Sequence, residues 1–176
     1  MVTGEGIAVM NDANGNLLFY TDGRTIWNKN HAQMTNGDNL EGSSSSTQSA
    51  IIIPFPCSSC KKYIVFTVGD SGTYTNKRNL KYTIVGFTNN PLGEVPLGNT
   101  NKNFFLRNKI SEKLTAVRGA NANEYFVVAH GYDETVNGGV NREYYVYRVN
   151  CNGVNETSTT YLGNAFQNGT GSLWVK

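Results

Sequence analysis

Residues 7–20 read IAVMNDANGNLLFY, two short apolar runs separated by a polar segment. The polar segment contains Asn14-Gly15, and an Asn-Gly pair between apolar runs predicts a β-hairpin, because both residues tolerate the positive φ angles that such turns require. Asp22-Gly23 then predicts a second turn into a strand at 25–27. The start of the chain is therefore expected to fold as three consecutive antiparallel strands.

The same pattern of short apolar runs bounded by turn residues continues to the end of the chain. Asn and Gly account for 24 and 19 of the 176 residues, and both disfavour helix interiors. Helical periodicity is almost missing, so the runs predict strands. The further strands are expected at 50–53, 63–68, 80–85, 104–106, 114–117, 125–129, 144–149 and 157–162. The predicted fold class is all-β.

The order of the strands repeats. The second strands of three units, at 17–20, 63–68 and 125–129, are nearly continuous apolar runs, which predicts burial on both faces. Residues 80–85 alternate instead, which predicts that Lys81 and Thr83 face water. Meandering units of about 45 to 60 residues with buried inner strands are typical of the blades of a β-propeller; a β-sandwich is the alternative.

A propeller closes with about four to eight blades. The sequence therefore predicts a single, incomplete propeller-like domain over 1–176, with antiparallel meander sheets as blades in units of about 4–30, 48–108 and 112–164. The polar stretch 28–49 is too long for a plain connector, so we expect either a functional loop or a cover over the core.

Composition argues against several classes of function. The net charge is +2 and charged residues make up 16% of the chain, which does not predict nucleic-acid binding. The apolar runs are far shorter than the roughly 20 residues of a membrane span, so no membrane insertion is expected. No basic and apolar leader follows Met1. Asp12–Asn16 has the oxygen-rich look of a calcium loop, but apolar residues replace the later ligands, so a plain turn is favoured.

Three cysteines occur, Cys57 and Cys60 in a Cys-Ser-Ser-Cys turn and Cys151 alone. A local disulfide between Cys57 and Cys60 is the first interpretation. Two inert thiols are the second, and metal or redox chemistry is the third. A zinc site would need two more ligands, and no second pair has ligand spacing. We expect no metal and no cofactor.

Several segments match a known family in register. They are TGEG (3–6), DANGNLLFYTDG (12–23), TIWNKNH (25–31), SSSSTQSA (43–50), EKLTAV (112–117) and YFVVAH (125–130). In these segments the chain resembles the N-terminal β-propeller-like module of large Bacteroidetes surface proteins associated with gliding motility and type IX secretion. The resemblance implies an extracellular or cell-surface location, a role in adhesion, and a chain that is either a fragment of a larger propeller or an unusually short relative. It supplies no catalytic residues.

The candidate binding residues lie in this matched part and combine an aromatic ring with polar groups: Asp22, Trp27, Asn28, His31, Ser45 and Gln48. Serine, histidine and carboxylate residues also occur here, but no nucleophile elbow accompanies them, so no catalytic site is predicted. We expect a non-enzymatic module that presents loops to a protein or glycan at the cell surface. The alternatives are a fragment of a propeller-fold hydrolase or lyase acting on extracellular polysaccharide, or a subunit of an extracellular assembly completed by further blades or by copies of itself.

Overall fold

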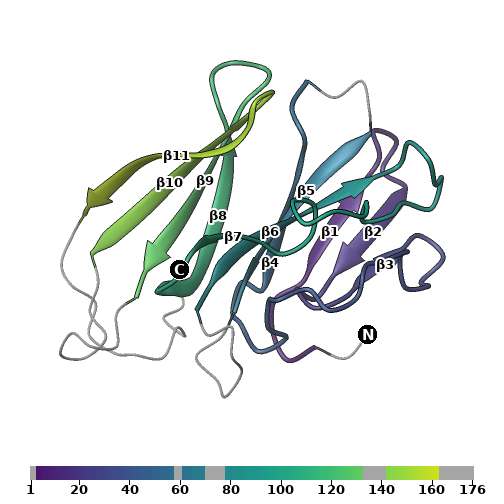
Figure 1. Cartoon of the computed structure of the whole chain (residues 1–176), viewed down its shortest axis with the longest axis horizontal. Helices are drawn as coiled ribbons and strands as arrows, with labels where there is room; N and C mark the ends of the chain where they lie inside the picture. The colour runs from purple at the N-terminus through teal and green to yellow at the C-terminus, as the bar shows by residue number, and fades with distance from the viewer. Residues whose placement is uncertain (1–2, 58–60, 70–77, 133–141, 163–176) are drawn as a thin grey trace.

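The computed structural model describes residues 3–57, 61–69, 78–132 and 142–162, and none of these residues is helical. Eleven strands form three antiparallel sheets (Figure 1). Sheet 1 contains β1 (Ala8–Asn11), β2 (Leu17–Thr21) and β3 (Ile26–Asn28). Sheet 2 contains β4 (Ala50–Pro54), β5 (Lys62–Val68), β6 (Leu80–Gly86) and β7 (Phe104–Arg107). Sheet 3 contains β8 (Ile110–Arg118), β9 (Tyr125–Gly131), β10 (Glu143–Asn150) and β11 (Gly153–Tyr161).

Every sheet is a meander in which each strand pairs with the next one along the chain. The three apolar ribbons that suggested a repeat are β2, β5 and β9, and each is the second strand of its own sheet. The sheets lie side by side in chain order, from right to left in Figure 1. The first strands β1 and β8 both lie next to β4. The all-β prediction and all eleven predicted strands are confirmed within a few residues at each end.

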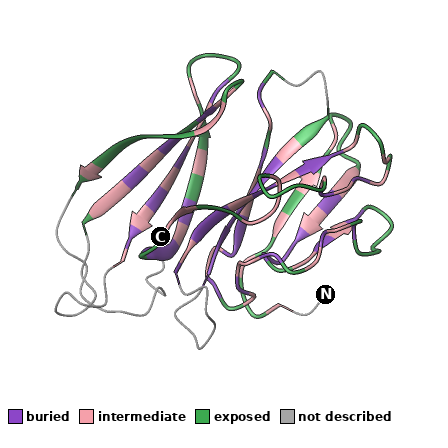
Figure 2. Cartoon of the chain, in the orientation of Figure 1, coloured by how far each residue is buried: buried purple, intermediate pink, exposed green. Residues whose placement is uncertain are grey.

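Two apolar cores separate the three sheets. Sheets 1 and 2 enclose Phe19, Ile26, Val65 and Val85, whereas sheets 2 and 3 enclose a larger group. Its buried members are Ile53, Ile64, Phe66, Val68, Leu80, Ile110, Leu114, Val127, Ala129, Tyr145, Tyr147 and Val149. Sheet 2 is thus covered on both faces, and buried residues are frequent along its strands (Figure 2).

The expected burial of all three second strands holds only for β5, whose residues 64–68 are all buried. In β2 and β9, buried residues alternate with partly exposed ones. The reason is position in the stack: β5 lies in the middle sheet, whereas β2 and β9 lie in end sheets, each with one face that no described sheet covers. Apolar composition along a strand therefore overstated its burial.

The prediction that Lys81 and Thr83 face water is wrong. Lys81 is 8% exposed and Thr83 is fully buried. Lys81 forms an ion pair with Glu41, and the Thr83 hydroxyl accepts a hydrogen bond from the Asn103 backbone N–H at 3.1 Å. The polar stretch 28–49 covers this side of the core and buries Met34 and Leu40 in it. Of the two interpretations of this stretch, the cover is confirmed.

The hairpin between β1 and β2 forms where the Asn-Gly pair predicted it. Gly15 has a φ of 85°, whereas Asn14 is not in the left-handed region. The Asp12 carboxylate accepts hydrogen bonds from the Asn14 and Asn16 backbone N–H groups at 2.9 and 2.8 Å, and from the Asn16 side chain. The side-chain bond from Asn16 contributes most to lowering the pKa of Asp12 below its usual value. The carboxylate oxygens stabilise the turn, as the plain-turn interpretation requires.

Candidate functional site

The six residues chosen from the sequence lie in three different environments. Asp22 and Asn28 are buried and bind backbone groups of their own turns. Asp22 Oδ1 accepts hydrogen bonds from the backbone N–H groups of Arg24 and Thr25 at 2.8 and 2.9 Å. Asn28 Oδ1 accepts one from the Asn30 N–H at 2.9 Å. Both side chains therefore shape the turns at the ends of β3.

Trp27 and His31 lie together on the face of sheet 1 that points away from sheet 2. The Trp27 ring stacks on the ring of Tyr20, with centroids 5.5 Å apart and planes inclined by 18°. His31 Nδ1 lies 3.2 Å from the Tyr20 hydroxyl oxygen. His31 thus contacts a phenol group. Tyr20 lies between Trp27 and His31, and much of the surface of these rings is covered by their contacts with one another.

Ser45 and Gln48 belong to the serine-rich segment, which lies at the junction of all three sheets. The backbone N–H groups of Gly4 and Gly6 bind the carbonyls of Ser44 and Ser46 at 3.1 and 3.3 Å. On the other side, the Thr47 N–H donates to Glu112 Oε2 in β8 at 3.0 Å.

The serine-rich segment is closely packed, with little space for larger residues. The Ser46 hydroxyl donates to the Val68 carbonyl at 3.1 Å. A Cβ atom on Gly6 would lie 2.8 Å from backbone atoms of this segment. Its described contacts join the segment before β1 to sheets 2 and 3, which is a structural role.

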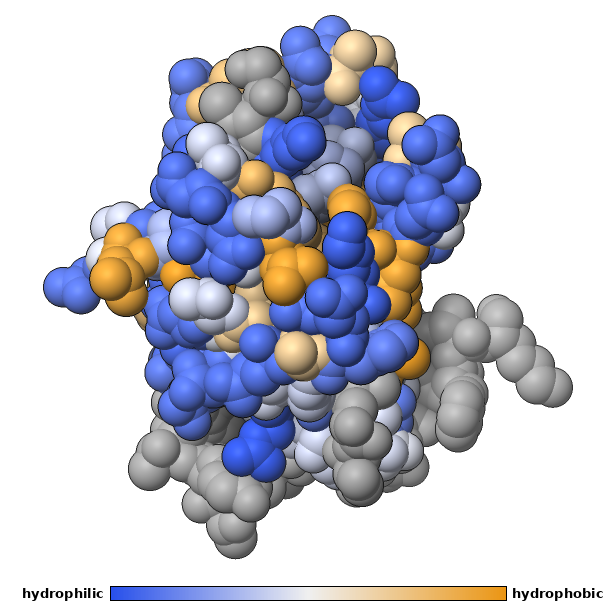
Figure 3. Space-filling model, turned by 90° about the vertical axis from the view of Figure 1, so that its right-hand side faces the viewer, coloured by the Kyte–Doolittle hydropathy of each residue, from blue (hydrophilic) through white to orange (hydrophobic). Residues whose placement is uncertain are grey.

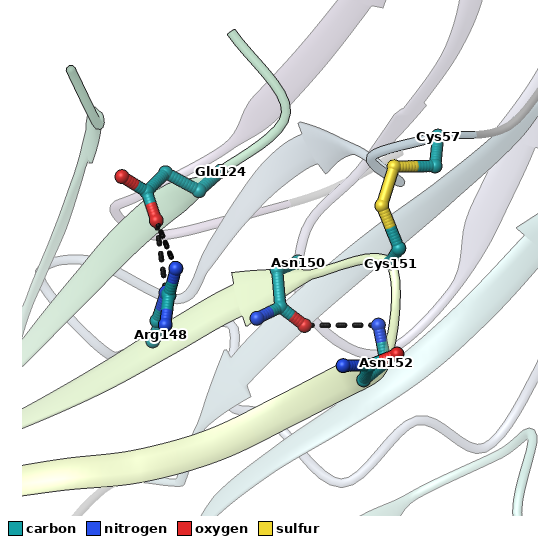
Figure 4. The surroundings of a disulfide bond; sticks show 6 residues. All are labelled: Cys57, Glu124, Arg148, Asn150, Cys151 and Asn152. Carbon is teal, nitrogen blue, oxygen red and sulfur yellow. Dashed lines mark hydrogen bonds and ion pairs between the residues drawn. A yellow bond between two sulfur atoms is a disulfide. The ribbon is translucent and has the colours of Figure 1, made fainter. Parts of the chain in front are cut away.

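The disulfide joins Cys57 to Cys151, so the local Cys57–Cys60 pairing is wrong; Cys60 lies outside the described residues. Cys57 follows β4 and Cys151 lies in the turn between β10 and β11, 94 residues later, with the two Cα atoms 5.3 Å apart. The bond therefore links sheet 2 to sheet 3 (Figure 4). The spacing of two cysteines in one turn suggested a local pair, but packing of the two sheets brings Cys151 to Cys57 instead.

The turns near the disulfide are held by their own polar contacts. Arg148 on β10 forms an ion pair with Glu124 in the turn before β9, with N–O distances of 2.8 Å (Figure 4). The Asn152 N–H donates to Asn150 Oδ1 at 2.9 Å. These bonds fix the β8–β9 turn and the β10–β11 turn against sheet 3, next to the cystine.

A pocket of about 610 Å³ opens beside the disulfide, and we call it the loop-end pocket. It lies between the segment that connects β4 to β5 and the turn that connects β8 to β9. Its lining residues are Pro54, Phe55, Pro56, Cys57, Lys61, Lys62, Tyr63, Ala122, Asn123 and Tyr125. The lining thus combines aromatic residues with two lysines and one exposed amide. No carboxylate is among these described lining residues.

The ionisable groups of the loop-end pocket differ in their contact with water. Lys61 and Lys62 are exposed, so their charges face solvent at the pocket mouth. The Tyr63 ring instead packs on Phe19 and Phe87 between sheets 1 and 2, where burial, and secondarily the negative charge of Asp12, raises its pKa above the usual value of 10.0. The described lining of the pocket therefore carries the two lysine charges.

A groove of about 410 Å³ continues from this pocket, and the two share Pro54 and Tyr125. The groove follows the first strands of all three sheets, from Ile7–Val9 across 50–54 to 114–116. Gln48 lines it, which makes it the one predicted binding residue found in either hollow. Its Nε2 donates to the Ala50 carbonyl at 3.0 Å.

Polar contacts at the opposite edge also hold sheets 2 and 3 together. The Arg107 guanidinium of β7 binds both Glu156 oxygens of β11, at 3.1 and 3.0 Å. It also lies 3.8 Å from the centre of the Tyr145 ring. Burial, and then a hydrogen bond to Glu143, raises the pKa of Tyr145 to about 12. Sheets 2 and 3 are thus joined at two places, by the Cys57–Cys151 disulfide and by the Arg107–Glu156 ion pair.

Sequence reasoning missed most of the pocket residues. Lys61 and Lys62 follow the Cys-Ser-Ser-Cys turn directly and resemble ordinary solvated charges, while Tyr125 resembles a core residue of a strand. The available signal was the coincidence of proline, aromatic and lysine residues over 54–63, which is unusual for a plain hairpin turn.

The described residues contain no group of three or more side chains placed to hold a metal ion. They also contain no helix with the length and apolar character needed to cross a membrane. The chain matches no protein-family model, no curated protein and no solved structure.

Proposed function

We propose that the chain is a non-enzymatic binding module of an extracellular or cell-surface protein, and that its loop-end pocket binds an acidic glycan. The observation that carries this proposal is the lining of the pocket, in which Phe55 and Tyr125 accompany Lys61 and Lys62 without a described carboxylate. A pocket of several hundred cubic ångströms with apolar walls and a few polar groups is the usual form of a small-ligand site.

Each kind of lining residue suits one part of such a ligand. The C–H face of a sugar ring packs against an aromatic or apolar wall, where both lose contact with water. An ammonium group attracts a carboxylate, and an amide such as that of Asn123 can both donate to and accept from hydroxyl groups. A neutral sugar would leave the two lysine charges unused, which is why an acidic sugar fits better.

Rigidity supports the same proposal. The Cys57–Cys151 disulfide and the Arg107–Glu156 clamp fix the two sheets that carry the pocket walls. A site that is already ordered before binding loses less conformational entropy when its ligand arrives. A module of this kind would hold a glycan by preformed loops on a β scaffold.

The proposal also includes the fold and the setting. Three meanders stacked in chain order, with a middle sheet covered on both faces, support three neighbouring blades of an open β-propeller. A disulfide between distant turns is typical of oxidising compartments, which supports an extracellular location. Together with the resemblance to gliding-motility and type IX secretion-associated surface proteins, these features favour an adhesive role.

Calorimetry with polygalacturonate as an anionic probe and dextran as a neutral one tests the binding site. We expect polygalacturonate to bind, dextran not to bind, and the affinity for polygalacturonate to fall as salt is raised. The double substitution Lys61→Gln and Lys62→Gln should weaken binding about tenfold or more, because two charge-assisted contacts are lost.

The matched control is Lys29→Gln, since Lys29 is an exposed lysine beyond β3 and outside the pocket lining. Its affinity should equal that of the unmodified protein. Equal loss in the control and the pocket variant would mean that charge alone attracts the probe. Unchanged binding by the pocket variant would place the site elsewhere.

A further inference from the structure

The two junctions between sheets are built in the same way. In the first junction, sheet 1 contributes Phe19 and Ile26, and sheet 2 contributes Tyr63, Val65 and Val85. In the second, sheet 2 contributes Ile64, Phe66 and Val68, and sheet 3 contributes Val127, Tyr145 and Tyr147. In both junctions phenylalanine comes from the earlier sheet and tyrosine with valine from the later sheet. Sheet 2 adds Tyr82 to the second junction, and sheet 3 adds Ile110 and Leu114. The first strands also follow one order, with β1 next to β4 and β4 next to β8.

Sheet 1 has one face that no described sheet covers. Val9, Tyr20 and Trp27 lie in register across β1, β2 and β3 on this face. Val9 is 52% exposed, and the two rings are partly exposed. Figure 3 views the molecule from the side on which sheet 1 lies, and apolar residues gather there in the middle of a largely hydrophilic surface. With its aromatic rings and a valine, this outer face of sheet 1 resembles the faces that sheets 2 and 3 turn toward the sheet before them.

Sheet 3 also has one face that no described sheet covers. Phe126 and Val128 alternate along β9 with the buried Val127 and Ala129, so they point away from sheet 2. Val146 pairs with Val128, and Val117 pairs with Phe126. Val117 is 58% exposed and the other three are partly exposed. This outer face of sheet 3 thus combines a phenylalanine and three valines with the paired rings of Tyr144 and His130, and with Arg148, which is bound to Glu124.

We propose that the outer face of sheet 3 of one copy of the chain docks on the outer face of sheet 1 of a second copy. The junction between copies would then repeat the two junctions inside each copy, with phenylalanine and valine facing tyrosine and tryptophan. The contact joins two different faces, so it is heterologous and closes into a ring if the rotation between successive sheets allows it. Two copies of the three-sheet unit supply six sheets, a number within the range of closed propellers.

The second copy is favoured as occupant because the contact continues an interface that the chain already uses twice. Each open face alone would leave apolar residues against water, and burying both faces in one contact removes that cost for both. The loop-end pocket lies between sheets 2 and 3 and includes none of Tyr20, Trp27, Phe126 or Val128. Self-association and glycan binding therefore involve different residues, and failure of one would not contradict the other.

Light scattering and sedimentation on the 176-residue chain test the proposal. The unmodified protein should show a concentration-dependent mass at a multiple of 19.3 kDa. Val9→Glu blocks the sheet 1 face and Val117→Glu blocks the sheet 3 face, and both residues are exposed enough for the chain to fold, which circular dichroism checks. Each substitution should raise the dissociation constant at least about 100-fold, because a carboxylate would be buried without a partner.

Mixing the two variants gives the decisive result. The Val9→Glu copy keeps its sheet 3 face and the Val117→Glu copy keeps its sheet 1 face, so an equal mixture should form a two-chain complex and nothing larger. Leu97→Glu, at an apolar residue 87% exposed in the segment between β6 and β7, is the control and should assemble like the unmodified chain. A monomeric unmodified protein at every concentration overturns the proposal, as does self-association of either single variant alone.

Discussion

Cys57 and Cys151 form a disulfide across the boundary between sheets 2 and 3, although 94 residues separate them in the chain. The bond ties the segment after β4 to the turn after β10, and the loop-end pocket opens next to it. Cys57 therefore has two roles, one as a covalent link between sheets and one as part of a pocket wall.

Breaking this bond should destabilise the fold. A crosslink that closes a loop of this length restricts the unfolded chain, and its loss typically costs about 2–4 kcal/mol. Cys57→Ser should therefore lower the free energy of unfolding in urea by about that amount, and a reducing agent should have the same effect on the unmodified protein. Thermal melts with and without reductant provide a second measurement.

Cys60→Ser is the matched control for the disulfide. It removes a cysteine three residues away without touching the Cys57–Cys151 bond. Its urea midpoint should match that of the unmodified protein, and peptide mapping without reduction should still recover the 57–151 link. Recovery of a 57–60 link, or equal destabilisation by both serine variants, would contradict the structure.

Gly42 lies so close to Gly23 that no larger residue fits. A Cβ atom at position 42 would come within 2.5 Å of the Gly23 carbonyl oxygen, which is backbone and cannot move aside easily. Gly42→Ala should destabilise the protein by about 1–3 kcal/mol, as overpacking of a closed site usually does. Urea unfolding measures this, with Gly86→Ala as control, because a Cβ there meets its nearest atom at 3.8 Å. A control change larger than about 0.5 kcal/mol would undermine the steric explanation.

The strands could be predicted because their signals are local. The runs at 17–20 and 63–68 and the Asn14-Gly15 turn need only neighbouring residues to form a hairpin. Burial could not be predicted in the same way, since it depends on which sheet covers which. Lys81 resembles a water-facing residue of an alternating strand, yet the segment containing Glu41 folds over it from 40 residues away.

The candidate site could be predicted from the sequence even less well than burial. Trp27 and His31 do lie together, because they are close in sequence and share one sheet face. The loop-end pocket joins Lys61 and Lys62 to Tyr125 from another sheet, and no spacing in the sequence relates these segments. The disulfide partner was equally hidden, since connectivity among three cysteines is set by the tertiary fold.

Glu124 should make stability depend on acid. Burial favours its neutral form, but hydrogen bonds from Arg148 and Asn121 outweigh this and hold the pKa of Glu124 below 4.5. Because the folded pKa is lowered, the stabilising contribution is complete above about pH 4.5 and is lost as the pH falls through the folded value. Glu124→Gln should therefore be less stable than the unmodified protein at pH 7, and the gap should narrow below pH 4.5. Urea midpoints from pH 3 to 7 measure it, with the exposed Glu5→Gln as control; a constant gap would contradict the assignment.

Tyr145 should stabilise the fold at neutral pH and lose this effect as the pH rises, the reverse of the pH dependence expected for Glu124. Burial first, and then the hydrogen bond to Glu143, raises its pKa to about 12 from the ordinary 10.0. A raised folded pKa means that the contribution is complete below pH 10 and is lost as the pH rises toward 12, because the unfolded chain releases this proton earlier. Melting temperatures between pH 8 and 11.5 should fall less steeply for Tyr145→Phe than for the unmodified protein, and absorbance at about 295 nm follows phenolate formation directly. The exposed Tyr161 also binds Glu143, so Tyr161→Phe is the control for losing that partner; identical slopes in the Tyr145→Phe and unmodified proteins would show that Tyr145 does not titrate late.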